Sequence, residues 1–223
     1  MEKFKKINKP TYQHQIYNIL EKMIISGQLQ PRHRLVESDL AQSMGVSRSP
    51  VREAILHLEQ EGLVINTKKG GWIVSEVSLR DILELYDLRK LIEVYAIKKG
   101  CLNCPQEIKN KMESNVGELK SQDIEIGVWQ ENNKRFHELI VQSSGNIKIY
   151  EVFLRTMKSL RWCTYLALAV LGRQEQSILE HRNILEVFLK QDPELAGKVI
   201  CEHIETVQKN IKSQWESVGF LKK

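Results

Sequence analysis

The amino-acid sequence predicts a mainly α-helical protein of two domains, and three observations support this fold class. Apolar residues recur at helical spacing along most of the chain. Two short β-prone runs lie near the N-terminus, at residues 63–65 and 72–74. The basic surplus lies at that end too, because residues 1–75 hold eleven Lys and Arg against seven Asp and Glu, and the rest hold twenty-two against twenty-one. We expect a small domain with a β-hairpin over residues 1–75 and an all-α helical bundle over residues 76–223.

Residues 36–62 predict two helices joined by a tight turn, which is the geometry of a helix-turn-helix. The first helix ends at Gly45, because glycine readily adopts the left-handed backbone that stops a helix. Ser47 or Arg48 opens the second helix, and Gly62 closes it. The two β-prone runs would then form a hairpin wing, whose tip contains two lysines and two glycines.

The start of the second helix suits contact with DNA. Arg48 and Arg52 are four residues apart, so they lie one turn above the other, and the neighbouring serines add hydroxyl groups. This end of a recognition helix can meet phosphates and guanine edges in a major groove. Lysines and glycines at the wing tip suit close approach to a nucleic-acid backbone. The expected DNA contacts are Ser38, Ser47, Arg48, Ser49, Arg52, Lys69 and Gly70.

The run GVSRSPVREA at residues 45–54, followed by Leu58 and by EGLV at residues 61–64, resembles the winged helix-turn-helix of the GntR family of bacterial transcription regulators. The alternative is a winged helix that packs against protein. One recognition helix covers too few base pairs for useful specificity, so we expect two copies on a two-fold symmetric operator. The resemblance also implies a homodimer, with double-stranded operator DNA as its partner.

The totals argue against a membrane or secreted protein. Of the 223 residues 42% are hydrophobic, yet no apolar run approaches the roughly eighteen residues of a membrane span. The N-terminal MEKFKKINKP lacks the apolar segment of a secretory signal, and the four cysteines fit a reducing, cytoplasmic compartment. Cys101 and Cys104 form a lone C-x-x-C, for which ordinary thiols are a better interpretation than a zinc site.

Helix start and stop signals divide the chain further. A first helix is expected from Thr11 to Ser26, and residues 27–34 read as a connector. Ser78 caps a helix that ends at Lys99, with Gly100 as its stop. The remaining expected helices are 105 to about 120, about 123–143, 146 to about 171, 173–190, and a last one that begins at Asp192-Pro193. These segments predict an all-α bundle of about six or seven helices.

Polar residues inside the apolar stripes of this bundle indicate a second site. All three histidines of the C-terminal domain fall on inward faces, each on a different predicted helix, and Asn133 precedes His137 by four residues. A single buried histidine is usually a satisfied core residue. Three converging imidazoles would repel one another if protonated, and a divalent metal ion removes that conflict. The candidate metal ligands are Asn133, His137, His181 and His203.

The order Asn133-x-x-x-His137, Glu180-His181, then His203 resembles the FCD ligand-binding domain of FadR-type GntR regulators over most of residues 78–215. The resemblance implies a site for zinc, nickel or manganese and a small organic acid or related metabolite as effector. Asn133 departs from the family pattern, which usually has Asp at that position, so a dication would bind less tightly. Three histidines and one oxygen suit zinc or nickel best.

Two inward-facing arginines are candidates for a carboxylate clamp beside the metal. Arg89 lies among the apolar residues of its predicted helix, with Glu93 one turn later, and Arg161 lies in a similar position on another helix. A clamp would bind a carboxylate effector through paired N–H donors. A structural ion pair between Arg89 and Glu93 is an equally good interpretation.

Taken together, these features predict a ligand-responsive transcription regulator, most simply a repressor. In one alternative the metal ion itself is the signal. In another the metal activates water in a hydrolase. The hydrolase is disfavoured, because G-x-S-x-G, H-E-x-x-H and phosphate-loop motifs are absent and an enzyme has little use for a winged helix. We therefore expect that the protein is not an enzyme.

Overall fold

The computed structural model describes residues 12–67, 71–76, 78–118, 126–167 and 173–218. The chain divides into two compact units, residues 1–77 and residues 78–223. No helix among these described residues has the length and apolar character needed to cross a membrane.

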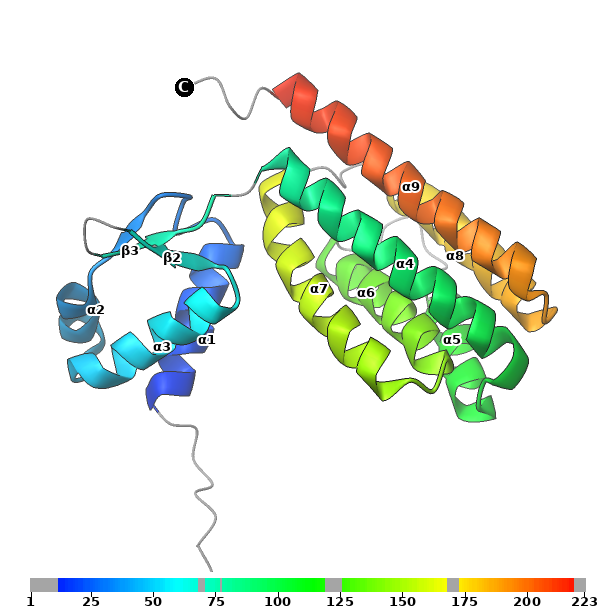
Figure 1. The fold of residues 1–223 in the computed structure, drawn as a ribbon, viewed down its shortest axis with the longest axis horizontal. Helices are drawn as coiled ribbons and strands as arrows, with labels where there is room; N and C mark the ends of the chain where they lie inside the picture. The colour runs from blue at the N-terminus through cyan, green and yellow to red at the C-terminus, as the bar shows by residue number, and fades with distance from the viewer. Residues whose placement is uncertain (1–11, 68–70, 77, 119–125, 168–172, 219–223) are drawn as a thin grey trace, which may run out of the picture. The chain divides into compact units, whose positions relative to one another are not determined.

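The N-terminal unit contains three helices and a small sheet (Figure 1). Helix α3 (Arg48–Gln60) packs against both α1 (Tyr12–Ile25) and α2 (Glu37–Met44). Their contacts bury an apolar core whose most enclosed side chains are Leu20, Ile24, Val51, Ile55 and Leu58. This arrangement confirms the predicted helix-turn-helix.

The turn between α2 and α3 forms as the sequence predicts. Gly45 ends α2 with a φ of 65°, in the left-handed region, and its N–H donates to the carbonyl of Gln42. The N–H of Val46 donates to the carbonyl of Ala41 at 3.0 Å. These bonds satisfy carbonyl groups at the end of α2, and the chain then reverses into α3 at Ser47.

The sheet has one strand more than the sequence predicts. Strands β2 (Val64–Asn66) and β3 (Trp72–Val74) form the expected hairpin, and β1 (Arg34–Leu35) pairs with the other edge of β3. Residues 27–34 were expected to be only a connector, and this was wrong for Arg34, which begins β1. A two-residue strand is too short to show a β period, and its pairing with β3 depends on contacts distant in sequence.

The C-terminal unit is an all-α bundle, as predicted. Its described helices are α4 (Leu79–Asn103), α5 (Gln106–Glu118), α6 (Ile126–Ser143), α7 (Ile147–Ala167), α8 (Gln174–Leu189) and α9 (Pro193–Val218). Helix α4 is central, because it packs against α6, α7, α8 and α9. Figure 1 shows α4 running between α7 and α9.

Two of the predicted caps are present. The Ser78 hydroxyl accepts the N–H of Asp81 while the Asp81 carboxylate accepts the N–H of Ser78, so α4 begins with a complete capping box. The Asp192 carboxylate accepts the N–H of Leu195 at the start of α9. Local side-chain chemistry therefore sets both helix starts.

The predicted stop at Gly100 was wrong, because α4 continues to Asn103. Gly100 is buried where α4 approaches α6, and a Cβ built on it would lie 1.9 Å from the Ser143 Oγ. The glycine therefore serves close helix packing and not helix termination.

Gly100→Ala is expected to destabilise the protein by about 1–3 kcal/mol, because added volume at a tightly packed contact forces neighbours to move. Gly117→Ala is the matched control, since Gly117 lies in α5 with nothing within 4 Å of its added Cβ. That change should be neutral or stabilise by up to about 1 kcal/mol. Urea unfolding of both variants tests the assignment, and equal midpoints would contradict it.

Candidate functional site

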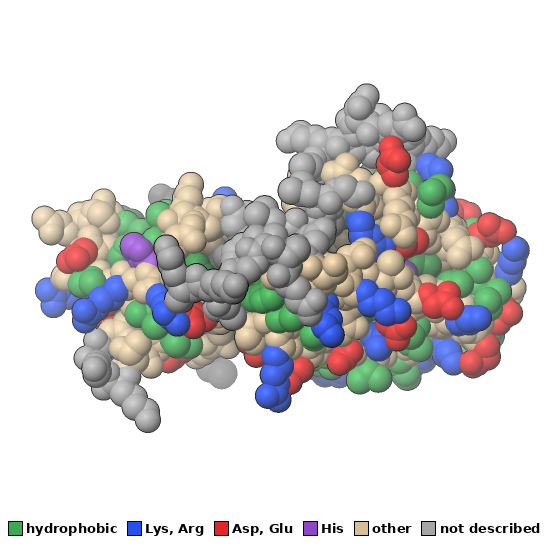
Figure 2. All heavy atoms as spheres, turned by 90° about the horizontal axis from the view of Figure 1, so that it is seen from above, with side chains coloured by type: hydrophobic (Ala, Val, Ile, Leu, Met, Phe, Trp, Pro, Cys, Tyr) green, Lys and Arg blue, Asp and Glu red, His purple; other side chains and the backbone are tan. Residues whose placement is uncertain are grey.

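The start of α3 presents the predicted DNA contacts to solvent. Ser47, Arg48, Ser49 and Arg52 are all exposed. Ser47 precedes α3 with an extended backbone and makes no side-chain cap hydrogen bond, so its hydroxyl is not used to close the helix. Figure 2 shows Lys and Arg side chains gathered at the left end of the N-terminal unit, where α2 and the start of α3 lie in Figure 1.

The other predicted DNA contacts are less completely defined. Ser38 lies in the first turn of α2, half-buried, with its hydroxyl donating to Asp39. Lys69 and Gly70 lie outside the described residues. On either side of them, the N–H of Thr67 donates to the carbonyl of Gly71 at 2.9 Å.

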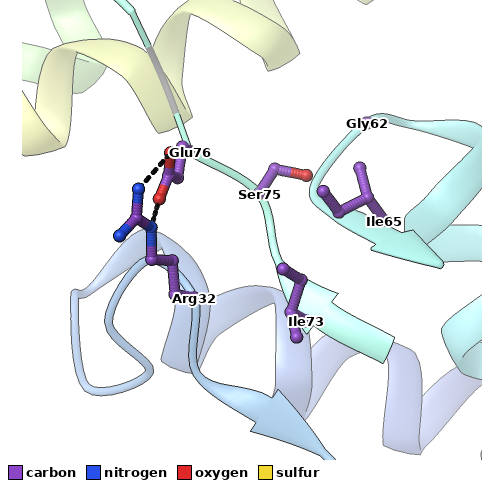
Figure 3. Close-up of a pocket in the computed structure, with 6 residues that line it drawn as sticks. All are labelled: Arg32, Gly62, Ile65, Ile73, Ser75 and Glu76. Atoms are coloured by element: carbon purple, nitrogen blue, oxygen red, sulfur yellow. Dashed lines mark hydrogen bonds and ion pairs between the residues drawn. The ribbon is translucent and has the colours of Figure 1, made fainter. Parts of the chain in front are cut away.

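The wing and the following segment carry a shallow pocket, lined by Arg32, Gly62, Ile65, Ile73, Ser75 and Glu76 (Figure 3). Arg32 forms an ion pair with Glu76, and both side chains are largely exposed. The Ser75 N–H donates to the carbonyl of Leu63. These contacts fix the chain as it leaves the sheet, and the pocket lacks the converging polar groups of a ligand site.

The three predicted histidines converge inside the C-terminal bundle. His137 lies on α6, His181 on α8 and His203 on α9, and all three are buried. One potential ligand atom from each lies within 4.8 Å of the others. The three helices therefore bring together side chains that are up to 66 positions apart in sequence.

Two of the imidazoles are held by carboxylates, of which Glu93 is fully buried and Glu180 is half-buried. The His137 Nδ1 lies 2.6 Å from the Glu93 Oε2, and the His203 Nδ1 lies 2.6 Å from the Glu180 Oε2. An ionised carboxylate only accepts hydrogen bonds, so each Nδ1 carries the proton. Each Nε2 is then a bare lone pair, and the two Nε2 atoms face each other at 3.3 Å. The His181 Nε2 is buried and has no hydrogen-bond partner.

Facing lone pairs require a positive charge between them, either a proton or a metal ion. Burial, reinforced by the nearby Arg89, holds the pKa of His137 well below its ordinary value of 6.5. Burial lowers the pKa of His181 in the same way, and also that of His203, although its bond to Glu180 acts in the opposite direction. A proton is therefore disfavoured at neutral pH, and the cluster is suited to a metal ion.

The geometry fits a borderline divalent metal. Zinc–imidazole bonds of about 2.0–2.1 Å in a tetrahedral site place two ligand nitrogens about 3.3–3.4 Å apart. The His137 and His203 Nε2 atoms have this separation. Carboxylates that hold the other ring nitrogen are the usual outer partners of metal-bound histidines. The triad could therefore hold a metal ion.

Asn133 lies one helical turn before His137 on α6 and is half-buried. Within the described residues no hydrogen bond joins its amide to the triad. Its role as the oxygen ligand stays a prediction.

The Cys101-x-x-Cys104 pair does not form a comparable cluster in the described part of the chain. Burial raises the pKa of the Cys101 thiol to about 11, so it is protonated at neutral pH, whereas a metal requires the thiolate. The ordinary-thiol interpretation is therefore favoured.

Arg89 forms the structural ion pair with Glu93, which was one of its two interpretations from the sequence. Its Nε lies 2.6 Å from the Glu93 Oε1, with both side chains buried. Burial raises the pKa of Glu93, but this close guanidinium favours the carboxylate form. The Arg89 Nη2 is buried without a hydrogen-bond partner. The side chain of Arg161, on α7, lies outside the described residues.

Arg89, Glu93 and His137 form one Arg–Glu–His chain of contacts, and the sequence did not predict a second chain of this kind. Arg173 binds Glu180 through its Nη2 at 2.7 and 2.8 Å, and Glu180 holds His203. Burial alone would raise the pKa of Glu180, but the bond to His203 and the nearby Arg173 lower it. Two Arg–Glu–His arms thus meet where His137 faces His203. The adjacency of Glu180 and His181 was visible in the sequence, but nothing there indicated which histidine Glu180 would hold.

Comparisons with known proteins agree with both units. Residues 12–74 match the model of bacterial regulatory proteins of the gntR family, and residues 84–206 match the FCD domain. The chain belongs to the GntR family of bacterial transcription regulators. It carries an FCD domain, and its family and relatives are transcription regulators, not enzymes.

Two relatives that are transcription regulators by name align along nearly the whole chain. YdhC of Bacillus subtilis (strain 168), an uncharacterized HTH-type transcriptional regulator, is 32% identical over 91% of this chain and 95% of its own length. The gluconate operon transcriptional repressor of Bacillus licheniformis is 26% identical over 92% of this chain and 86% of its own. The solved structure of McbR/YncC from E. coli has a TM-score of 0.69 at 21% identity, covering 94% of this chain and 100% of that one.

Proposed function

We propose that this GntR-family regulator binds a palindromic operator as a homodimer and that a small carboxylate, bound beside a divalent metal in the FCD domain, controls its affinity for DNA. The observation that supports this most strongly is the buried His137, His181 and His203 cluster with two bare Nε2 atoms 3.3 Å apart. A bundle that only needed a stable core would fill this space with apolar side chains. Repression is inferred by analogy with the Bacillus licheniformis relative, which is a repressor by name.

In this proposal each group has a distinct role. His137, His181 and His203, with Asn133 as a weaker oxygen ligand, would hold zinc or nickel, and the bound ion would supply an open position for a carboxylate. Glu93 and Glu180 orient the imidazoles and fix their tautomers. DNA contact falls to Ser47, Arg48, Ser49 and Arg52 at the start of α3, together with Ser38, Lys69 and Gly70.

Arg89 and Arg173, near the histidine cluster, have buried nitrogens without hydrogen-bond partners that could bind a carboxylate ligand. The Arg89 Nη2 is buried and unpaired, and so are the Nε and Nη1 of Arg173. Leaving buried donors unpaired is costly, and a carboxylate satisfies guanidinium N–H groups well. Both arginines influence His181 electrostatically, which places them around one centre. Arg161 remains a further candidate on α7.

The test is a titration of an operator, selected from random double-stranded DNA, with metal-free protein, zinc-loaded protein, and zinc-loaded protein plus a panel of mono-, di- and tricarboxylates. We expect an acid to lower DNA affinity only when zinc is present. If zinc alone changes the affinity and no acid adds to it, the metal is the signal. Equal affinity in all arms would contradict effector control through this site.

A further inference from the structure

We propose that Asn115, Asn132 and Trp129 bind a neutral polar group, a carboxamide or a pair of hydroxyls, at the far end of the effector. This inference rests on the proposed function, in which the carboxylate of the effector lies beside the metal centre. It names the class of acid that the C-terminal unit accepts.

The three side chains are buried, yet each keeps a polar atom without a partner. Asn115 lies on α5, whereas Trp129 and Asn132 lie on α6, which packs against α5. Their exposed fractions are 1%, 4% and 8%. In the described part of the chain, the Asn115 Oδ1, the Asn132 Oδ1 and the Trp129 Nε1 have no hydrogen-bond partner. Buried polar atoms are normally satisfied, so three exceptions on two packed helices indicate a place where a bound molecule supplies the partners.

The orientation of both amides follows from the partners of their NH2 groups. The Asn115 Nδ2 donates to the backbone carbonyl of Asn132 at 3.2 Å, and the Asn132 Nδ2 donates to the Glu118 carboxylate at 3.3 Å. A carbonyl and an ionised carboxylate only accept hydrogen bonds, so neither amide can be reversed. The two amide atoms without partners are therefore carbonyl oxygens, and the first of these bonds places the Asn115 amide beside Asn132.

The buried side of α6 connects these groups to the histidine cluster. At 3.6 residues per turn, Trp129 lies between Asn132 and Asn133 around the helix. Phe136, one turn after Asn132, stacks on His181 with ring centroids 4.1 Å apart. Trp129 precedes Asn133, the proposed oxygen ligand, by one turn, which is about 6 Å along the helix axis. An acid of about four to six carbons spans that distance at ordinary bond lengths.

The atoms without partners define the chemical class of the group that binds them. Two acceptors and one donor are matched by a group that donates two hydrogens and accepts one. A carboxamide does this through its NH2 and its oxygen, and two neighbouring hydroxyls do it together. A second carboxylate only accepts, so it would face the two amide oxygens and leave them unsatisfied. An alkyl end would leave all three atoms unsatisfied, which is costly in a buried site.

Isothermal titration calorimetry on the zinc-loaded, full-length protein tests this class with matched acids of four, five and six carbons. At each length the far end is a methyl group, a second carboxylate, a carboxamide or a run of hydroxyls. The six-carbon set is hexanoate, adipate, adipamate and gluconate. At one of these lengths we expect the carboxamide or the hydroxy acid to bind at least about tenfold more tightly than the methyl-ended acid and the dicarboxylate. The acid that does so identifies the group.

Trp129→Phe keeps an aromatic ring but removes the N–H donor. It should lower the affinity for the preferred acid about tenfold and leave the affinity for the methyl-ended acid unchanged. Trp72→Phe is the matched control, because Trp72 lies in β3 of the N-terminal unit, and it should keep the preference. An equal loss for both acids in Trp129→Phe would show that Trp129 only packs and would overturn the inference.

The failure of this inference is distinct from the failure of the proposed function. If methyl-ended acids or dicarboxylates bind as tightly as the carboxamide and hydroxy acids, the polar subsite is overturned and the carboxylate effector stands. A tightly held water that already satisfies the three atoms would give this result. If no acid of any kind binds the zinc-loaded protein, both the subsite and the carboxylate effector are overturned.

Discussion

Zinc or nickel, supplied at a hundredfold excess over its dissociation constant, is expected to raise the melting temperature of the wild-type protein by about 5–10 °C. A ligand that binds only the folded state at this excess adds about 2.7 kcal/mol of stability. In a chain of this size each kcal/mol shifts the midpoint by about 2–4 °C. The bare Nε2 atoms of His137 and His203, with neutral rings at pH 7, are the reason to expect binding.

Two variants and a control make this prediction specific. His203→Ala should abolish the metal-dependent shift, whereas His33→Ala should retain it, because His33 is exposed in the N-terminal unit. Asn133→Asp should enlarge the shift, since a carboxylate attracts a dication more strongly than an amide does. If the histidines are only core residues, metal has no effect on the wild type. Asn133→Asp would then simply destabilise the protein by burying an unpaired charge.

Arg48→Ala and Arg52→Ala are each expected to cost about 1–3 kcal/mol in operator binding, if each arginine makes a bidentate contact to a base. Both side chains are exposed at the start of α3, and Arg52 lies only 3.9 Å from Glu37, a weak pairing that DNA can displace. The loss should be large for the operator and small for unrelated DNA.

Fluorescence anisotropy with operator and scrambled DNA measures this difference. Arg155→Ala, an exposed arginine on α7, is the control and should leave the affinity unchanged. Lys69→Ala should weaken binding to both DNAs and lower the salt slope by about one, as expected for a phosphate contact. Full operator affinity in the double variant Arg48→Ala, Arg52→Ala would refute the recognition helix.

The parts of this fold that the sequence predicted well are those determined by local chemistry. Gly45, Ser78 and Asp192 end or begin helices through bonds to residues within a few positions of themselves, so their signals could be read directly. Gly100 also looked like a helix stop in the sequence, but α4 continues through it to Asn103. Its missing Cβ makes room for Ser143, 43 positions later, and no local pattern shows that.

In the candidate site too, residues marked by a local pattern could be predicted, whereas contacts between distant residues could not. The three histidines could be found because each interrupts an apolar stripe on its own helix. The carboxylates that hold them could not be assigned, because Glu93 reaches His137 across 44 positions and Glu180 reaches His203 across 23. These pairings depend on how α4, α6, α8 and α9 pack, as does the 3.3 Å approach of His137 to His203.

The most direct test of the metal centre is X-ray absorption spectroscopy at the zinc edge on the zinc-loaded, full-length protein. We predict three histidine nitrogens and one or two oxygens in the first shell, with nitrogens at about 2.0–2.1 Å. His137→Ala should remove one imidazole from that shell. A shell with sulfur at about 2.3 Å would place zinc on cysteine and contradict the histidine site.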